Sequence, residues 1–510
     1  MRSRWIIIMV LALAAGAVSA QRRIPCVRPD TVATRGTRAV LPSVRNDWDP
    51  QKTYRQPVVL ITFKDRAFSM DDPVAFYNRI FNEPGYNEGV GKGCIADYFR
   101  EQSGGRFNVQ FDLYGPIQAD TTVANKTGGT NYGSYAIHNV MKSLCRTSDA
   151  DFSIYDWDGD DQVDQVLFIA AGYNGAYGNN KGYIWPSTSY DNFQTPGGKY
   201  VSMSSISTEL WDDVYGSCGI GTIIHEFAHC LGLPDLYPTS NAGFSVVDDW
   251  DLMDGGNYIN WGWCPPNFSA LEKMLLGWDT PVELNEATTI TGMKPVSEGG
   301  TAYLVRNSGI PDEYYILENR CQSGWDYGVP GNGLLICHVD YDPIAWSDNV
   351  VNTQKDHFRY DLFHPDGKNY KDWDPAQNGK DMSKYTMDKR LRSSYLSTTT
   401  YPYVNPETGV SIQSLTDDTT PAATLFNANA AFEYKMSKPI TNIQLADDGT
   451  VSFSFMGDGT AVKGVTTAKT GEAAVWYDLN GGRLSASPSR AGIFIRRNPD
   501  GTSRKVVIHK

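Results

Sequence analysis

After its first 20 residues the sequence has no long hydrophobic run, and no stripe of positive charge occurs anywhere in it. A membrane-spanning helix needs about 20 apolar residues in a row, so the chain beyond residue 20 is predicted to have no transmembrane segment. Asp and Glu number 58 against 45 Lys and Arg, and the net charge of −13 argues against a nucleic-acid partner or an anionic membrane surface. Internal repeats and low-complexity segments are also missing. The 510 residues, 41% hydrophobic and 20% charged, exclude a disordered chain and favour about three domains.

Residues 1–20 have the pattern of a secretory signal peptide. Arg2 and Arg4 precede a short apolar stretch, and Val18 and Ala20 occupy the small-residue positions of a cleavage site. An N-terminal membrane anchor is the alternative, but the apolar core is short and no stop-transfer flank follows. We therefore expect a secreted or cell-surface protein, cut after Ala20.

Export allows disulfides to form among the eight cysteines. Eight cysteines can be paired in 105 ways, so the sequence does not determine the pairing. A helix between Cys218 and Cys230 would hold them about 18 Å apart, which disfavours a disulfide between these two. The cysteines are Cys26, Cys94, Cys145, Cys218, Cys230, Cys264, Cys321 and Cys337.

The periodicity of apolar residues divides the rest of the chain. Residues 21–55 are rich in Arg and Pro and are predicted to form a pro-segment or N-terminal arm. Strand and helix patterns alternate over 56–284, which predicts an α/β (α+β) domain. Residues 285–440 show mostly the period of two that is typical of strands, and 441–510 repeat it with Asp-Gly and Gly-Gly turns. These two segments predict a β-rich region and a small C-terminal β-sandwich.

The segment GTIIHEFAHCLGLPDLY, residues 221–237, carries the clearest chemical signal. His225 and His229 are four residues apart, so on a helix both imidazoles project from one face and can bind one zinc ion. Glu226 then lies beside the open metal position. Zinc lowers the pKa of a bound water from about 15.7 to about 7, and an adjacent carboxylate can take its proton and return it to a leaving amine. The alternative is a surface helix with two solvated histidines, but only 7 histidines occur in the chain.

Asp235 is the predicted third zinc ligand. Gly232 suits the left-handed turn at a helix end and Pro234 discourages resumption of the helix, so the chain can reverse and bring Asp235 back to the metal. In the alternative, Asp235 is a turn residue and another segment supplies the ligand. Spare candidates, none recommended by spacing, are His138, His338, His357 and His364.

The HExxHxxGxxD pattern is followed by WDLMDGG at residues 250–256. Together they resemble the metzincin plan, with Met253 as the Met-turn. Over about residues 55–345 the sequence more narrowly resembles the immune inhibitor A-like secreted zinc metallopeptidases. The resemblance implies a zincin-like catalytic domain over 56–284 with one catalytic zinc held by His225, His229 and Asp235, and Glu226 as the catalytic residue. One departure concerns the Tyr that follows the Met by two residues in some metzincins, because position 255 is Gly and the nearest Tyr is Tyr258.

The acidic loop DWDGDDQVD, residues 156–164, predicts a structural calcium site, because oxygen ligands at alternate positions can converge on one ion. Immune inhibitor A-like enzymes have a similar Asp-rich loop before a strand. The loop departs from an EF-hand, since Asp161 replaces the usual Gly and Leu167 the usual Glu. A plain acidic turn is the alternative. The predicted ligands are Asp156, Asp158, Asp160, Gln162 and Asp164.

The segment IPCVRPD, residues 24–30, suggests a zymogen. The thiolate of Cys26 could occupy the open zinc position, as in the switch of matrix metalloproteases, and Asp30 could do the same through its carboxylate. A disulfide at Cys26 is the alternative. At the other end, YDLNG and GIFI within residues 474–510 resemble the sorting domains of type IX secretion cargo, which implies the secretion machinery as a partner. A β-sandwich without that role is the alternative.

Taken together, the residues predict a secreted zinc endopeptidase that hydrolyses peptide bonds of proteins through a water bound to zinc and activated by Glu226. The edge strand that faces the substrate is predicted at residues 201–207. An inactive peptidase-fold protein that binds or adheres to surfaces is one alternative, and a zinc hydrolase of a non-peptide substrate is another. Cleavage specificity depends on pocket shape and cannot be derived from the metal motif.

Overall fold

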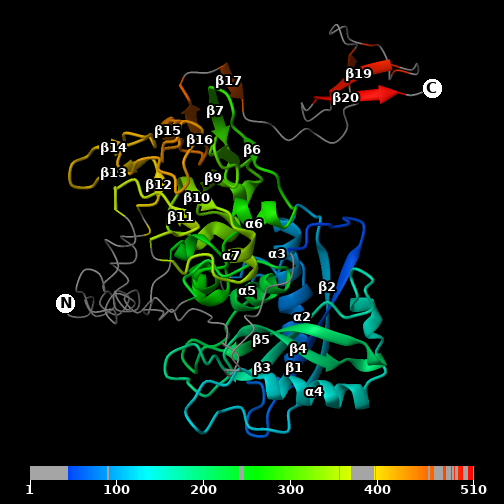
Figure 1. Ribbon diagram of the computed structural model, residues 1–510. Coiled ribbons are helices and arrows are strands. Elements are labelled where there is room, and N and C mark those ends of the chain that lie inside the picture. Colours follow the sequence, from blue (N-terminus) through cyan, green and yellow to red (C-terminus); the bar gives the residue numbers. More distant parts are fainter. Residues whose placement is uncertain are drawn as a thin grey trace, which may run out of the picture.

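The computed structural model describes residues 44–88, 91–239, 246–354, 356–368, 396, 398–457 and 460–463, and in the C-terminal segment 475–477, 484, 488, 492–497 and 503–508. The predicted signal peptide, Cys26 and Asp30 lie outside the described residues. Figure 1 shows a layered α/β part and a β-rich part beside it. Within the described residues, no helix has the length and apolar character needed to cross a membrane.

The α/β part is built on a five-stranded sheet in the order β2-β1-β3-β5-β4. Neighbouring strands are parallel except β4, which runs antiparallel to β5 at the edge. The strands are β1 (Thr53–Thr62), β2 (Asn108–Gln118), β3 (Val166–Tyr173), β4 (Ser187–Gln194) and β5 (Tyr200–Leu210). The predicted alternation of strands and helices over this part is confirmed. The prediction of an edge strand at 201–207 was wrong, because these residues belong to β5, which has a neighbour on both sides. The edge strands of this sheet are β4, next to β5, and β2 at the other end.

Helices cover both faces of this sheet, as expected where parallel strands are buried on both sides. Val59 and Ile61 of β1 share one core cluster with α4, while Val58 and Leu60 share another with α2, α3 and α5. The alternation of side chains along one strand therefore sets which helix each residue meets. The helices are α2 (Pro73–Asn82), α3 (Ile95–Gln102), α4 (Ser134–Thr147) and α5 (Gly221–Cys230), and α6 (Ala270–Leu275) ends this part.

The β-rich part contains two larger sheets. One has the order β11-β10-β9-β8-β6, with β12 also paired to β10, and its central strands β9 and β10 are buried at every residue. The other has the order β15-β16-β7-β17. The first sheet comprises β6 (Val282–Glu283), β8 (Tyr303–Arg306), β9 (Glu313–Arg320), β10 (Gly333–Asp340), β11 (Tyr360–Leu362) and β12 (Thr400–Tyr401), and the second β7 (Thr288–Met293), β15 (Ile440–Leu445), β16 (Val451–Phe455) and β17 (Thr460–Lys463).

The two sheets share one hydrophobic core. Leu317 and Ile336 of the first sheet belong to the same cluster as Ile290 and Phe453 of the second. A domain boundary was predicted at residue 441. Strand β7 precedes this position and β16 follows it, and because the two strands pair, they belong to one packed unit. The described residues beyond β17 form a three-stranded antiparallel sheet of β18 (Val475–Tyr477), β19 (Gly492–Arg497) and β20 (Ser503–Ile508). A C-terminal sandwich stays a prediction.

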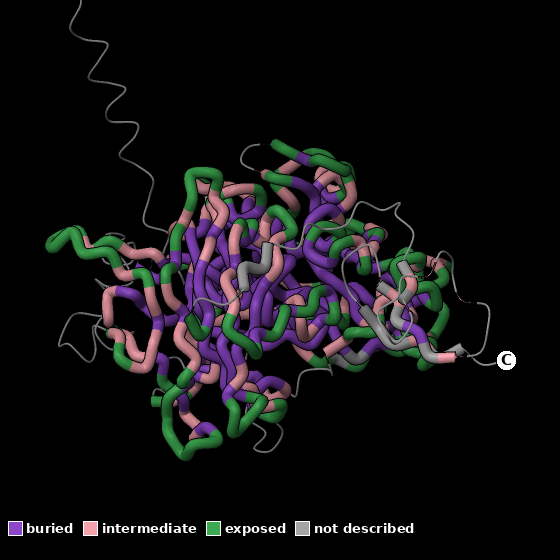
Figure 2. Tube along the Cα trace, turned by 90° about the horizontal axis from the view of Figure 1, so that it is seen from above, coloured by how far each residue is buried: buried purple, intermediate pink, exposed green. Residues whose placement is uncertain are grey.

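Shorter elements complete the chain. The β-rich part also has helix α7 (Pro343–Ser347) and the hairpin of β13 (Tyr403–Val404) and β14 (Ser411–Ile412). The 3₁₀ helices are η1 (Phe152–Tyr155), η2 (Pro196–Gly198), η3 (Asp248–Trp250), η4 (Gly255–Gly262), η5 (Val296–Glu298) and η6 (Gly324–Gly328). Figure 2 shows buried residues concentrated along the strands and helices in the interior, and exposed residues on the outer loops.

The described end of the predicted N-terminal arm packs on the α/β part. The indole of Trp48 lies 4.5 Å from the ring of Phe107, centroid to centroid, and its Nε1 donates to the carbonyl of Leu276 at 2.6 Å. The backbone N–H of Arg45 donates to the carbonyl of Leu231, just after α5. Residues 45–48 therefore contribute to the packing of this domain.

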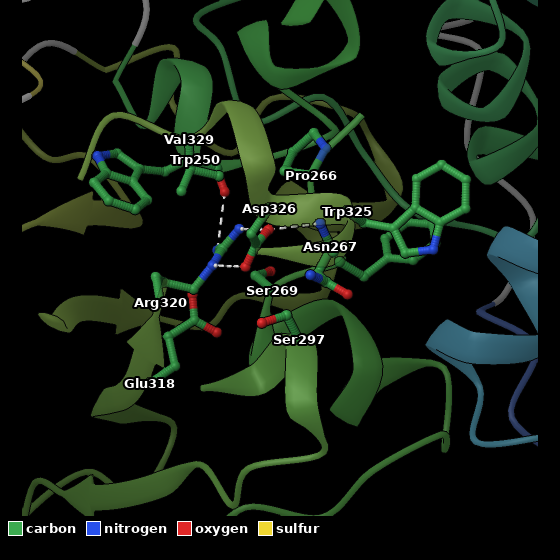
Figure 3. Close-up of polar contacts among 12 residues, drawn as sticks. Trp250, Pro266, Asn267, Ser269, Ser297, Glu318, Arg320, Trp325, Asp326 and Val329 are labelled. Carbon is green, nitrogen blue, oxygen red and sulfur yellow. Dashed lines mark hydrogen bonds and ion pairs between the residues drawn. The ribbon is translucent and has the colours of Figure 1, made fainter. Parts of the chain in front are cut away.

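A buried ion-pair network joins the β-rich part to the segments around α6 (Figure 3). The guanidinium of Arg320, which is 0% exposed, donates to both carboxylate oxygens of Asp326 at 2.7 and 2.8 Å and to Glu318 at 3.0 Å. It also donates to the carbonyl of Trp250 at 3.0 Å. Asp326 in turn accepts from the backbone N–H of Asn267. Since each guanidinium nitrogen has an acceptor, the positive charge of Arg320 is compensated inside the protein.

Candidate metal centre and active site

The HEFAH segment lies on α5, whose ten residues are all buried. The helix begins at Gly221, where a Cβ atom would come within 2.0 Å of the carbonyl oxygen of Asn257, so only glycine permits this packing. It ends at Cys230, and Gly232 follows with φ of +98°, the left-handed conformation predicted for this position. The chain thus turns back after Leu231, and Asp235 returns towards the helix.

The side chains of His225, His229 and Asp235 converge. Asp235 Oδ1 lies 3.2 Å from Nε2 of His225 and 3.1 Å from Nε2 of His229, and the three groups offer ligand atoms within 4.8 Å of one another. Nδ1 of His225 bonds to the carbonyl of Leu252 at 2.9 Å, and Nδ1 of His229 to the carbonyl of Leu233 at 2.7 Å. Because a carbonyl only accepts, each Nδ1 carries the hydrogen, and the lone pair of each neutral imidazole is at Nε2, where a metal would bind.

The unpaired atoms of this cluster fit a divalent cation. Nε2 of His225, Oδ1 of Asp235 and Oε1 of Glu226 are buried without a hydrogen-bond partner. Buried lone pairs that meet no donor are costly, and a metal ion is the group that satisfies them together. Two imidazole nitrogens and one carboxylate oxygen form a ligand set that zinc accepts.

The charges of this cluster also shift the pKa values of its members. Burial acts to lower the pKa of His225, but the carboxylates of Asp235 and Glu226 outweigh it and raise that pKa to about 9. Burial acts to raise the pKa of Asp235, and the imidazoles of His229 and His225 hold it well below its ordinary value. The site therefore favours a positive charge between the imidazoles and the carboxylate.

Glu226 is almost fully buried, at 1% exposure, and one of its oxygens is held by the edge strand. The hydroxyl of Thr188 on β4 lies 2.8 Å from Oε2 of Glu226 and 2.8 Å from its backbone carbonyl. Burial raises the pKa of the Glu226 carboxyl, which suits a group that takes up and returns a proton. Thr188 was not among the predicted residues, because its contact depends on strand order and no local motif marks it.

The segment 251–254 contacts both α5, which carries the two histidines, and the segment that carries Asp235. The carbonyl of Leu252 accepts from His225, and the carbonyl of Met253 accepts from the backbone N–H of Leu236 at 2.9 Å. Met253 is fully buried. Its role as a Met-turn stays a prediction. Tyr258 is buried against Trp211, with the rings 5.7 Å apart.

The four spare histidines lie apart from this cluster among the described residues. His338 bonds to Glu313 at 2.8 Å, and His357 to Asp340 at 2.6 Å. Thus Asp235, and none of these histidines, completes the described group. No disulfide with Cys230 forms at Cys218, as expected for two cysteines separated by α5. Free thiols are found at Cys94, Cys145, Cys218, Cys264, Cys321 and Cys337.

The acidic loop brings together part of the predicted calcium set. Carboxylate oxygens of Asp156, Asp158 and Asp164 lie within 4.8 Å of one another. The guanidinium of Arg45 pairs with Asp164 and, at 3.4 Å, with Asp158. Burial raises the pKa of Asp164 to about 6, although Arg45 acts to lower it.

The other two predicted calcium ligands bind each other. Gln162 donates to the carboxylate of Asp160 through its backbone N–H at 2.8 Å and through Nε2 at 3.2 Å. The carboxylate of Asp160 is not part of the group that the other three carboxylates form.

The site combines two histidines on one helix, a carboxylate after the helix and a buried glutamate next to the first histidine. This combination is typical of metallopeptidases. Comparison with known proteins agrees: residues 62–277 match the family described as immune inhibitor A peptidase M6, catalytic domain. This part of the chain, less than half of its length, is therefore similar to the catalytic domain of a family of peptide-bond hydrolases.

Two curated relatives carry corresponding names. Immune inhibitor A of Bacillus thuringiensis subsp. alesti is 24% identical over 269 residues, which cover 42% of this chain and 38% of that protein. Pre-pro-metalloprotease PrtV of Vibrio cholerae serotype O1 (strain M66-2) is 22% identical over 265 residues, which cover 45% of this chain and 28% of that protein. The match thus spans less than two fifths of either relative.

Proposed function

We propose that this protein is a secreted zinc-dependent endopeptidase that hydrolyses peptide bonds of protein substrates. The observation that carries the proposal is the convergence of His225, His229 and Asp235 beside the unpartnered, buried Oε1 of Glu226. The resemblance of the HExxHxxGxxD pattern to metzincins, with Met253 in the Met-turn, supports the same function.

In this mechanism His225, His229 and Asp235 hold zinc, which when bound supplies a Lewis acid that acidifies water and polarises the scissile carbonyl. Glu226 takes the proton of the attacking water and delivers it to the leaving amine. The hydroxyl of Thr188 fixes one oxygen of Glu226, so that Oε1 faces the reaction. Among the described residues β4 is the last strand on its side of the sheet, and the outer edge of such a strand is where an extended substrate can pair through its backbone.

Casein digestion tests this function. The purified chain from Gln21 is expected to contain about one zinc per molecule and to cleave casein at internal bonds. Dialysis against 1,10-phenanthroline should abolish cleavage, and added zinc should restore it. A protein that binds zinc but leaves casein and a panel of unrelated proteins intact, with or without residues 21–43, would instead indicate the inactive binding protein.

Secretion and latency complete the proposal. The pattern of residues 1–20 supports export, and YDLNG and GIFI near the C-terminus support a contact with type IX secretion machinery. Cys26 or Asp30 would keep the zymogen inactive by occupying the open zinc position. Because residues 45–48 pack on the domain, a maturation cut in this proposal precedes Arg45.

We further propose a structural calcium ion at the acidic loop, supported by the convergence of Asp156, Asp158 and Asp164. Excess EGTA is expected to lower the unfolding temperature, because three neighbouring carboxylates repel one another once a divalent cation is removed. Scanning calorimetry of the zinc-loaded protein measures this shift, with calcium added back as the control. An unchanged unfolding temperature would leave Arg45, and Lys199 beside Asp156, as the counter-charges and remove the calcium proposal.

A further inference from the structure

A loop of the β-rich part contacts the third metal-ligand candidate directly. Nδ2 of Asn349 donates to Oδ2 of Asp235 at 2.7 Å, and Oδ1 of Asn349 accepts from the backbone N–H of Asp235 at 2.6 Å. Both polar atoms of the asparagine side chain are therefore used by one residue. Asn349 is 5% exposed and Asp235 1%, so water does not compete for these bonds.

The backbone holds Asn349 in place for this contact. Its φ is +56°, in the left-handed region, which asparagine tolerates better than most residues. The residue follows α7, whose Trp346 is buried in a hydrophobic cluster that both the α/β part and the β-rich part contribute to. Its own carbonyl accepts from the hydroxyl of Thr239 at 2.9 Å, a second bond to the segment that carries Asp235.

Asn352 secures the same two segments three residues further on. Its Nδ2 donates to the carbonyl of Leu236 at 2.7 Å and to the carbonyl of Tyr360 on β11 at 2.8 Å. The loop is thus bound both to β11 of its own sheet and to the segment that follows α5.

The consequence concerns the two oxygens of Asp235. Asn349 occupies Oδ2, while Oδ1 faces Nε2 of both histidines and has no hydrogen-bond donor. The amide therefore decides which oxygen is available to the metal and prevents the carboxylate from rotating.

We propose that Asn349 is a positioning residue for the metal centre, and that the β-rich part thereby completes a site whose ligands all lie within the matched residues 62–277. The inference rests on the proposed function only in that the metal is zinc. It predicts that the peptidase domain and the β-rich part act as one unit in binding the metal.

Zinc affinity of the full chain tests this role. Asn349→Ala and Asn349→Gly both delete the amide, and glycine also removes any cost of the left-handed backbone. Both variants are expected to bind zinc about 10–100-fold more weakly, as is typical when the partner of a metal ligand is removed. Affinity is measured by competition with a chromophoric chelator, together with the rise in unfolding temperature on addition of zinc.

Asn319→Ala is the matched control. This asparagine is also buried and donates to two backbone carbonyls, those of Met293 and Gly449, but lies in the β-rich part without a contact to a metal-ligand candidate. Its loss should lower the unfolding temperature and leave zinc affinity within about twofold, well under the loss expected for a partner of a metal ligand.

Each of the following outcomes overturns one of the hypotheses. Folded Asn349→Gly with the zinc affinity of the parent overturns the positioning role, and so does weakened binding in Asn349→Ala alone, since that would trace to backbone strain. Weakened binding in Asn319→Ala to the same extent would show a general loss of stability. A parent chain that binds no zinc contradicts the proposed function itself.

Discussion

Replacing Glu226 by Gln is expected to lower kcat/KM for peptide hydrolysis by about 10²–10⁴-fold, the usual contribution of a positioned acid or base. Glutamine has nearly the same shape and can still accept the hydrogen bond of Thr188, but it cannot take a proton from water. The ligands His225, His229 and Asp235 are untouched, so zinc content should stay near that of the parent. Hydrolysis of a fluorogenic peptide and metal analysis of the same samples measure the two effects.

Glu83→Gln is a suitable control, because the carboxylate of Glu83 is exposed at the end of α2, where it pairs with the partly exposed Arg79. It should retain full activity. A Glu226→Gln protein that holds zinc and cleaves as fast as the parent would remove Glu226 from the mechanism, whereas loss of zinc together with activity would mean that the substitution had disturbed the metal centre.

The largest effect on stability is expected at Arg320. Arg320→Met removes the cation but leaves the carboxylates of Glu318 and Asp326 buried together, and an uncompensated buried charge costs about 3–5 kcal/mol of unfolding free energy. The shift of the urea-unfolding curve of the full chain, followed by tryptophan fluorescence, measures this loss.

Arg306→Met provides the comparison, because Arg306 pairs with Glu283 while a third of its side chain remains exposed. Surface pairs contribute about 0–1 kcal/mol. Equal unfolding curves for the two variants would mean that the buried network contributes no more than a surface pair, and that the carboxylates of Glu318 and Asp326 are neutralised in another way.

Local patterns predicted much of the fold correctly. The strand and helix segments of the α/β part, from β1 to α5, follow the spacing of apolar residues, because side-chain direction repeats every two residues in a strand and every 3.6 in a helix. The order of strands did not follow from these patterns. The run at 201–207 looks like any short strand, and only its pairing with both β3 and β4 makes it internal.

The sheets of the β-rich part show the same division. The alternation in VSFSF, residues 451–455, predicted a strand there, but not that β16 would pair with β7 more than 150 residues earlier. Such pairing is a long-range choice, because many strands offer similar backbone edges and the packing of their side chains selects among them.

For the candidate metal centre, local sequence patterns were enough to predict that His225 and His229 share a helix face, that Glu226 lies between them and that the chain turns at Gly232 towards Asp235. These are consequences of helix geometry and of the conformational freedom of glycine, which act over a few residues. The contact of Thr188 with Glu226, and that of Asn349 with Asp235 from 114 residues away, follow from the folded arrangement alone. Those contacts depend on how the sheets and helices pack, because hydrogen bonds between distant segments form only where packing brings donor and acceptor together.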